Sequence, residues 1–97
     1  MIEILRTSLD KANAPNASAL DINEALMDLV CVNRLAKHNV VQLKAIFSVL
    51  KVELEQFLNG SVFLESMKGN LPSVKQDLVE VHTSFLTSNI HEIKDQI

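Results

Sequence analysis

The chain has 97 residues, of which 47% are hydrophobic and 22% charged, and its formal net charge is −3. A chain of this length forms one domain around one core, and this composition excludes a disordered polypeptide. The acidic balance argues against a nucleic-acid partner, because binding to phosphates requires an excess of lysine and arginine.

The composition also indicates the fold class. The chain has only two glycines and two prolines, and it contains no alternating run of β-branched and aromatic residues bounded by turn residues. Four phenylalanines are the only aromatic residues, so aliphatic side chains must supply most of the packing. An all-α fold follows from these features.

The sequence also favours one cellular compartment. Its N-terminus lacks the basic segment and apolar stretch of a secretory signal, and no apolar run approaches the ~20 residues of a membrane span. The single cysteine, Cys31, cannot close an intrachain disulfide, as is usual in a reducing compartment. We therefore expect a soluble, cytoplasmic protein that has no membrane partner.

The first predicted element is a short helix over residues 2–12. Its apolar residues recur at helical spacing on one face, and a loop with Pro15 follows over residues 13–19. The apolar face consists of Ile2, Leu5, Leu9 and Ala12.

A long central helix is predicted over residues 21–58. Asp21 and Glu24 have the spacing of a capping box, and Asn59-Gly60 marks the end. At 1.5 Å per residue this helix would be roughly 55 Å long, which predicts a rod. A turn at His38-Asn39 would instead give a compact four-helix bundle. One apolar stripe runs through the segment in constant phase: Leu29, Val32, Ala36, Val40, Leu43, Phe47, Leu50, Leu54 and Phe57.

Two further helices are predicted, over residues 61–68 and 72–96. The apolar face of the last helix shifts partway along it, which predicts two different neighbours. The first set, expected to pack on the central helix, is Val74, Leu78, Val81 and Phe85. The second set is Val79, Leu86, Ile90, Ile93 and Ile97.

Catalytic and metal-binding patterns are weak throughout. The three histidines do not have the spacing of metal ligands, and Cys31 lies among apolar residues, where a thiol is usually a small core residue. No glycine-rich phosphate loop or nucleophile with a base is recognisable. We expect no enzymatic activity, no cofactor, no metal and no small-molecule substrate.

One alternative is a phosphotransfer function. In length and helicity, and with His38 following Leu35-Ala36, the chain resembles the histidine-phosphotransfer domains. That resemblance implies a four-helix bundle in which His38 carries the phosphoryl group. Those domains typically follow the histidine with Leu-Lys-Gly, whereas this chain continues with Asn39-Val40-Val41.

Basic residues provide a second alternative. They form a ridge beside the apolar stripe, and three of them are spaced by seven residues. The ridge could dock an acidic partner or, in a DNA-associated regulator, contact the duplex; it could also be a solvated flank of the helix. Its members are Arg34, Lys37, Lys44 and Lys51.

The central helix carries more apolar surface than two flanking helices can cover. We therefore expect an elongated antiparallel helical hairpin or bundle that is completed by oligomerisation, most simply as a dimer. The predicted function is a non-enzymatic interaction module that self-assembles or binds a helical partner, as an adaptor, chaperone or regulatory subunit. The predicted interface residues are Leu86, Ile90, Ile93, Ile97, Leu35, Ile46 and Val49.

Overall fold

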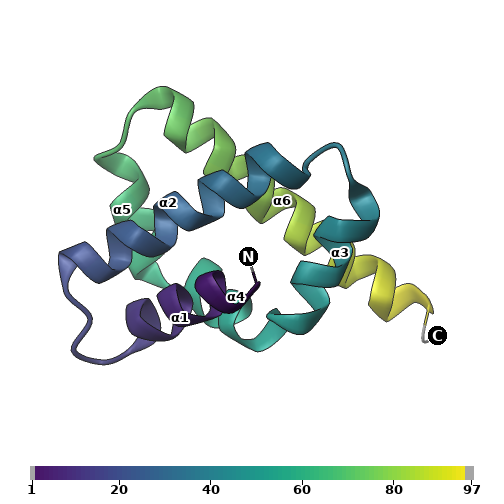
Figure 1. The fold of residues 1–97 in the computed structure, drawn as a ribbon, viewed down its shortest axis with the longest axis horizontal. Helices are drawn as coiled ribbons and strands as arrows, with labels where there is room; N and C mark the ends of the chain where they lie inside the picture. Colours follow the sequence, from purple (N-terminus) through teal and green to yellow (C-terminus); the bar gives the residue numbers. More distant parts are fainter. Residues whose placement is uncertain (1, 96–97) are drawn as a thin grey trace.

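The computed structural model describes the backbone of residues 2–95 and the side chains of residues 2–88. This part of the chain contains six helices and no strand, which confirms the all-α prediction (Figure 1). The helices are α1 (Ile2–Asn13), α2 (Ala19–Ala36), α3 (Val40–Val49), α4 (Lys51–Leu58), α5 (Ser61–Lys68) and α6 (Pro72–Asp95).

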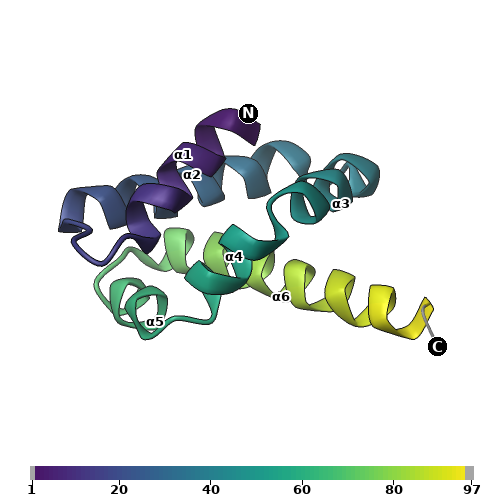
Figure 2. The same cartoon turned by 90° about the horizontal axis from the view of Figure 1, so that it is seen from below.

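Helix α2 is the centre of the bundle and packs against both α1 and α6. Figure 2 shows α1 and α2 on one side of the molecule and α5 and α6 on the other. Helix α4 closes the bundle by packing against α1, and α3 connects α2 to α4. One cluster of buried apolar side chains, contributed by all six helices, forms the core.

The phenylalanines join helices that are distant in the chain. The rings of Phe47 and Phe85 meet edge to face with their centroids 5.5 Å apart and link α3 to α6. The ring centroid of Phe63 lies 5.7 Å from that of Phe57 and 5.4 Å from that of the His82 imidazole. Phe63 therefore joins α4, α5 and α6. Aromatic pairs of this geometry contribute about 0.5–1.5 kcal/mol beyond the area that they bury.

The N-cap of α2 lies three residues earlier than the spacing of Asp21 and Glu24 predicts. The Ser18 side chain accepts a hydrogen bond from the backbone N–H of Asp21, and the Asp21 carboxylate accepts one from the backbone N–H of Ser18, both at 3.1 Å. Ser18 is therefore the N-cap, and Asp21, the third residue of the helix, completes the capping box.

The prediction of one continuous central helix over residues 21–58 is wrong. The chain leaves the helix after Ala36 and starts α3 at Val40, and it bends again at Leu50, between α3 and α4. The Asn39 side chain accepts a hydrogen bond from the backbone N–H of Gln42 at 3.1 Å and caps α3. No described residue has a positive φ, so this turn needs no glycine.

The bends fold the apolar stripe around one core. Eight of its nine residues are buried, and the exception is Val40, which is 60% exposed at the start of α3. The bend at Leu50 also brings α4 to the end of α1, where the Asn13 amide donates a hydrogen bond to the Glu53 carbonyl at 3.1 Å. The Gln56 amide donates in return to the Asn13 carbonyl at 3.3 Å.

The prediction of an elongated rod is also wrong, because the chain bends between α2, α3 and α4. The molecule measures 39 × 28 × 23 Å, well short of a 55 Å helix, and is a compact bundle rather than an elongated hairpin. In α6 the first predicted set of apolar residues packs inward, since Leu78, Val81 and Phe85 are fully buried. In the second set Val79 and Leu86 are 50% and 41% exposed, and the side chains of residues 90, 93 and 97 lie outside the described part.

Candidate functional site

The exposed side of α2 and the adjoining side of α1 form the main candidate site. These two helices run in opposite directions (Figure 1), and a groove of about 340 Å³ lies between them. Leu5 and Val32 are buried at its floor, whereas Ile4 and Leu35 are 65% and 69% exposed at its edges. The remaining lining residues are Asp28 and Cys31.

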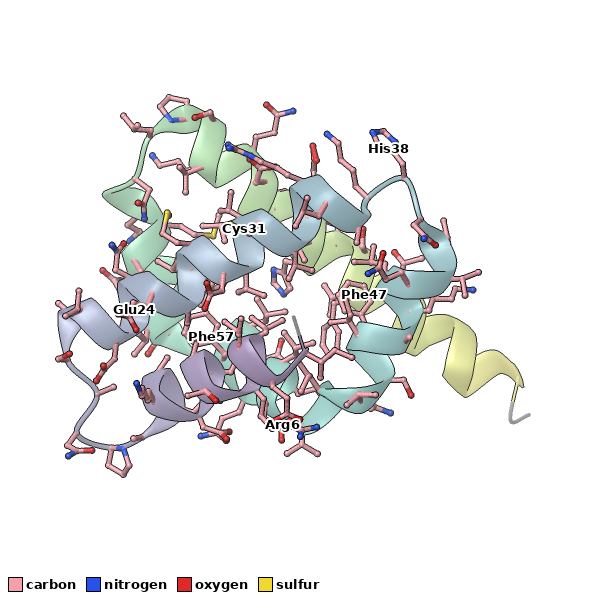
Figure 3. All side chains as sticks on the ribbon, viewed as in Figure 1. Arg6, Glu24, Cys31, His38, Phe47 and Phe57 are labelled. Carbon is pink, nitrogen blue, oxygen red and sulfur yellow. The ribbon has the colours of Figure 1, made fainter. Side chains whose placement is uncertain are left out.

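Helical spacing on α2 explains this arrangement. Residues 24, 28, 31 and 35 follow one another by three or four positions, so they share one side of α2, which adjoins α1. Figure 3 shows Glu24 and Cys31 along this helix. We call the surface formed by Ile4, Glu24, Asp28, Cys31 and Leu35 the α2 face.

The α2 face is apolar at one end and acidic at the other. Ile4, Cys31 and Leu35 make the apolar end, and Glu24 and Asp28 lie toward the N-terminus of α2. The Ser8 hydroxyl, which is buried on α1, donates a hydrogen bond to the Asp28 carboxylate. This hydrogen bond holds the Asp28 carboxylate at the wall of an otherwise apolar groove.

The opposite side of α2 is held to α6 by a polar cluster. The buried Asn33 amide donates hydrogen bonds to Asp77 at 2.8 Å and to Glu80 at 3.2 Å. Arg34 forms an ion pair with Asp77, with Nε and Nη2 at 2.9 and 2.8 Å from Oδ2. The hydrogen bond from Asn33 lowers the pKa of the Asp77 carboxyl most strongly, burial opposes this effect, and Arg34 lowers the pKa further.

The predicted basic ridge is divided among three helices. Arg34 is engaged with Asp77, while Lys37 and Lys44 line a groove of about 390 Å³ between α3 and α6. Lys51 lies at the start of α4 and is half-buried. The α3–α6 groove has hydroxyl groups of α6 on its other wall, and its apolar floor residues Leu43 and Phe47 are already buried.

The histidines occupy two contrasting environments. His38 is exposed in the turn between α2 and α3, and not within a central helix over residues 21–58. His82 lies against Phe63, and its Nε2 atom is buried with no hydrogen-bond partner among the described residues. Burial lowers the pKa of the His82 imidazole. No sequence signal distinguished His82 from a surface histidine.

The structure places the predicted interface residues in different settings. Leu35, Val49 and Leu86 are exposed, and they lie on three different helices, α2, α3 and α6. Ile46 is buried at 2% exposure in the core, so one chain already covers it. Cys31, expected in the core, is exposed. The predicted interface residues Ile90, Ile93 and Ile97 have side chains outside the described part.

Residues 2–88 hold no metal site and no membrane-spanning helix. No group of three potential ligands among His, Cys, Asp and Glu is placed to hold a metal ion there. A groove of about 570 Å³ between α2 and α5 is lined by no titratable side chain. None of the described helices combines the length and apolar character needed to cross a membrane.

Comparison of the chain with protein-family models, with curated proteins and with solved structures finds no match.

Proposed function

We propose that this protein is a non-enzymatic interaction module that assembles with itself or binds a helical partner through the α2 face. The observation that carries the proposal is the groove between α1 and α2, whose edges are the 65% exposed Ile4 and the 69% exposed Leu35. Covering two such side chains yields on the order of 2–4 kcal/mol. Apolar surface gathered around a groove is typical of sites where proteins associate.

The shape of the site favours a helix as the ligand. Two antiparallel helices leave a groove between them, and the side-chain ridge of a third helix packs into such a groove. The carboxylates of Glu24 and Asp28 would attract basic residues on that helix. A module of this kind acts as an adaptor, chaperone or regulatory subunit.

The α2 face is a better candidate than the α3–α6 groove. The apolar floor of that groove, Leu43 and Phe47, is only 7% and 4% exposed, so a partner would remove little further apolar surface from water. Its exposed residues include Lys37 and Lys44, whose ammonium groups are costly to desolvate.

Site-specific photocrosslinking tests the proposal. Cys31 is the only cysteine, so a benzophenone maleimide labels the α2 face alone. Irradiation in an extract of the source organism is expected to yield a discrete adduct, which mass spectrometry assigns to a second copy or to another protein. The affinity of the assigned partner is then measured calorimetrically with unlabelled protein.

Matched variants make the result specific. Leu35→Asp places a charge on the α2 face and is expected to weaken binding at least ~10-fold, because the carboxylate must lose water. Leu64→Asp changes a 57% exposed leucine on α5 and is expected to leave binding unchanged. Circular dichroism confirms that both variants remain helical. The absence of a discrete adduct, or equal weakening by both variants, would refute the proposal.

A further inference from the structure

Helix α5 is held to the rest of the bundle by apolar contacts alone. Its side chains form one ion pair in the described part of the chain, between Glu65 and Lys68 of the helix itself. No hydrogen bond or ion pair joins α5 to another helix there. By contrast, Ser8 bonds α1 to α2, and Asn33 bonds α2 to α6. Release of α5 would therefore break no polar contact with the other described helices.

The position of α5 depends on one side chain. The helix has eight residues and no side-chain N-cap. Helices shorter than about 12 residues are marginal in water unless they pack against other elements. Phe63 is the only buried residue of α5, with 0% exposure, and Met67 is only partly buried against the core. Figure 2 shows α5 at the edge of the bundle. Loss of the contacts of Phe63 would therefore free this helix.

The buried ring of Phe63 lies against a titratable group. Its aromatic neighbours are Phe57 and the imidazole of His82, which it meets edge to face at an interplanar angle of 83°. The Nε2 atom of His82 is buried and has no hydrogen-bond partner among the described residues. In a protonated imidazole both nitrogens carry a hydrogen and require an acceptor. Burial lowers the pKa of His82, so the packed arrangement favours the neutral imidazole.

No charged group of the adjoining helix α5 balances an imidazolium at this position. Burial is the only influence that shifts the pKa of His82, so no described carboxylate or ammonium group acts on it. Glu65 and Lys68 of α5 pair with each other at the surface. Lys75 lies two turns before His82 on the same side of α6 and is itself positive. The charged residues of α4 are Lys51, Glu53 and Glu55.

The charged groups at the contacts of α6 with α2 and α3 lie on another side of α6. Asp77 is five positions from His82, about 140° around the helix, and binds Arg34 of α2. Glu80 accepts a hydrogen bond from Asn33 on that side. Lys37 and Lys44 line the α3–α6 groove with Ser84, which is about 160° from His82 around α6. A proton on His82 therefore has no counter-charge from these helices.

We infer that α5 is an acid-sensitive segment, in which protonation of His82 releases the helix from α6 and uncovers the apolar side chains of Phe57, Phe63 and Met67. The inference goes beyond the proposed function, because none of these residues belongs to the α2 face. In the released form the imidazole reaches water, where it is half protonated at a pH of about 6.5.

The direction of the pH dependence follows from the two forms. The packed form has the lower pKa, so it binds a proton less readily than the released form. The ratio of released to packed α5 therefore stays constant above a pH of about 6.5, rises as the pH falls below that value, and levels off below the pKa of the packed form.

Hydrogen exchange measured by mass spectrometry at about pH 7.5 and about pH 5 tests the inference, because these conditions lie on either side of the ordinary histidine pKa. Protection factors are compared, since they correct for the effect of pH on the exchange chemistry. The protection of α5 relative to α2 is expected to fall at least ~5-fold at the lower pH, because a buried charged donor without an acceptor is costly.

Three variants assign the effect to one histidine. His82→Leu removes the titratable group and is expected to leave the relative protection of α5 equal at the two pH values. His82→Gln keeps a neutral polar side chain and is expected to abolish the pH response as well, even where it loosens α5 at both pH values. His38→Gln changes an exposed histidine in the turn between α2 and α3 and is the control, with the response of the wild type.

Two kinds of result would overturn the inference. The first is a wild-type protein in which the protection of α5 relative to α2 is the same at both pH values, whether acid loosens both helices equally or neither. The second is a pH response of α5 that persists in both His82→Leu and His82→Gln. The adduct at Cys31 reports on the α2 face, so failure of either inference is distinguishable from failure of the other.

Discussion

Substitution of proline at Val40 distinguishes the broken helix of the structure from a continuous one. Val40 is the first residue of α3, directly after the N-cap Asn39. A proline is accommodated at this position, because the first N–H of a helix has no intrahelical acceptor and the fixed φ of proline suits a first turn. Asn39 has φ −123° and ψ 87°, close to the extended conformation that a residue before proline prefers.

The matched control is proline at Ala45. Ala45 is also exposed but lies in the middle of α3, where the proline ring clashes with the carbonyl of Val41 and removes a helical hydrogen bond. Proline in a helix interior costs about 3 kcal/mol or more. Val40→Pro removes a side chain that is already 60% exposed, so its cost should stay within about 1 kcal/mol.

Thermal unfolding followed by circular dichroism measures the difference. For a domain of this size, 1 kcal/mol corresponds to about 4–8 °C in Tm. Val40→Pro is therefore expected to melt within about 8 °C of the wild type, and Ala45→Pro more than about 12 °C below it. If Val40→Pro lowers Tm as much as Ala45→Pro does, then the helix is continuous through residues 37–39 and the deduction from the cap is wrong.

Two neighbouring residues of α6 provide a second test. Leu78→Asp is expected to unfold the protein, because Leu78 has 0% exposure and the charge would be buried. Val79→Asp is expected to change Tm little, because Val79 is 50% exposed. Equal effects in thermal melts would contradict the assignment of the buried face. The His82 imidazole has a lowered pKa in the folded state, so its contribution to stability is fully present above its unfolded pKa of about 6.5 and is lost as pH falls below that value. His82→Leu is expected to be neutral or stabilising at pH 7 and to reduce the loss of Tm between pH 7 and pH 5; an unchanged pH dependence would show that other groups cause it.

Some features of the fold could be predicted because they depend on neighbours in the chain. The helix over residues 61–68 agrees with α5, and the inward set Leu78, Val81 and Phe85 agrees with the core. The signal for the start of α2 was also present in the sequence, since Ser18 and Asp21 have capping-box spacing, but Asp21 and Glu24 have the same spacing. Local patterns of this kind limit the possible N-cap residues without always deciding between them.

Parts of the candidate site could not be predicted. Cys31 and Leu35 are apolar residues on a helix that is apolar around much of its circumference, and their exposure depends on which sides α1 and α6 cover. Asn33 interrupts an apolar run in the sequence, but no prediction singled it out. Its partner Asp77 is 44 positions away, and no local pattern connects them.

The sequence by itself determined that the chain is helical and which residues are buried along most of it. Periodicity of three and four residues specifies a helix and an apolar side, because both depend on geometry within one or two turns. Eight of the nine residues of the central stripe are buried, as the pattern requires.

Only the tertiary structure decided that this stripe is folded into three helices. The spacing from Ala36 to Leu43 suits two turns of one helix, and it also suits a short turn between two helices that face the same core. The turn over residues 37–39 needs no glycine or proline, because no residue in it has a positive φ, so the local sequence carried no marker that excluded a continuous helix. Burial of Leu43, Phe47 and Leu54 against distant helices favours the bent chain, since a straight helix of this length would leave much of its apolar surface in water.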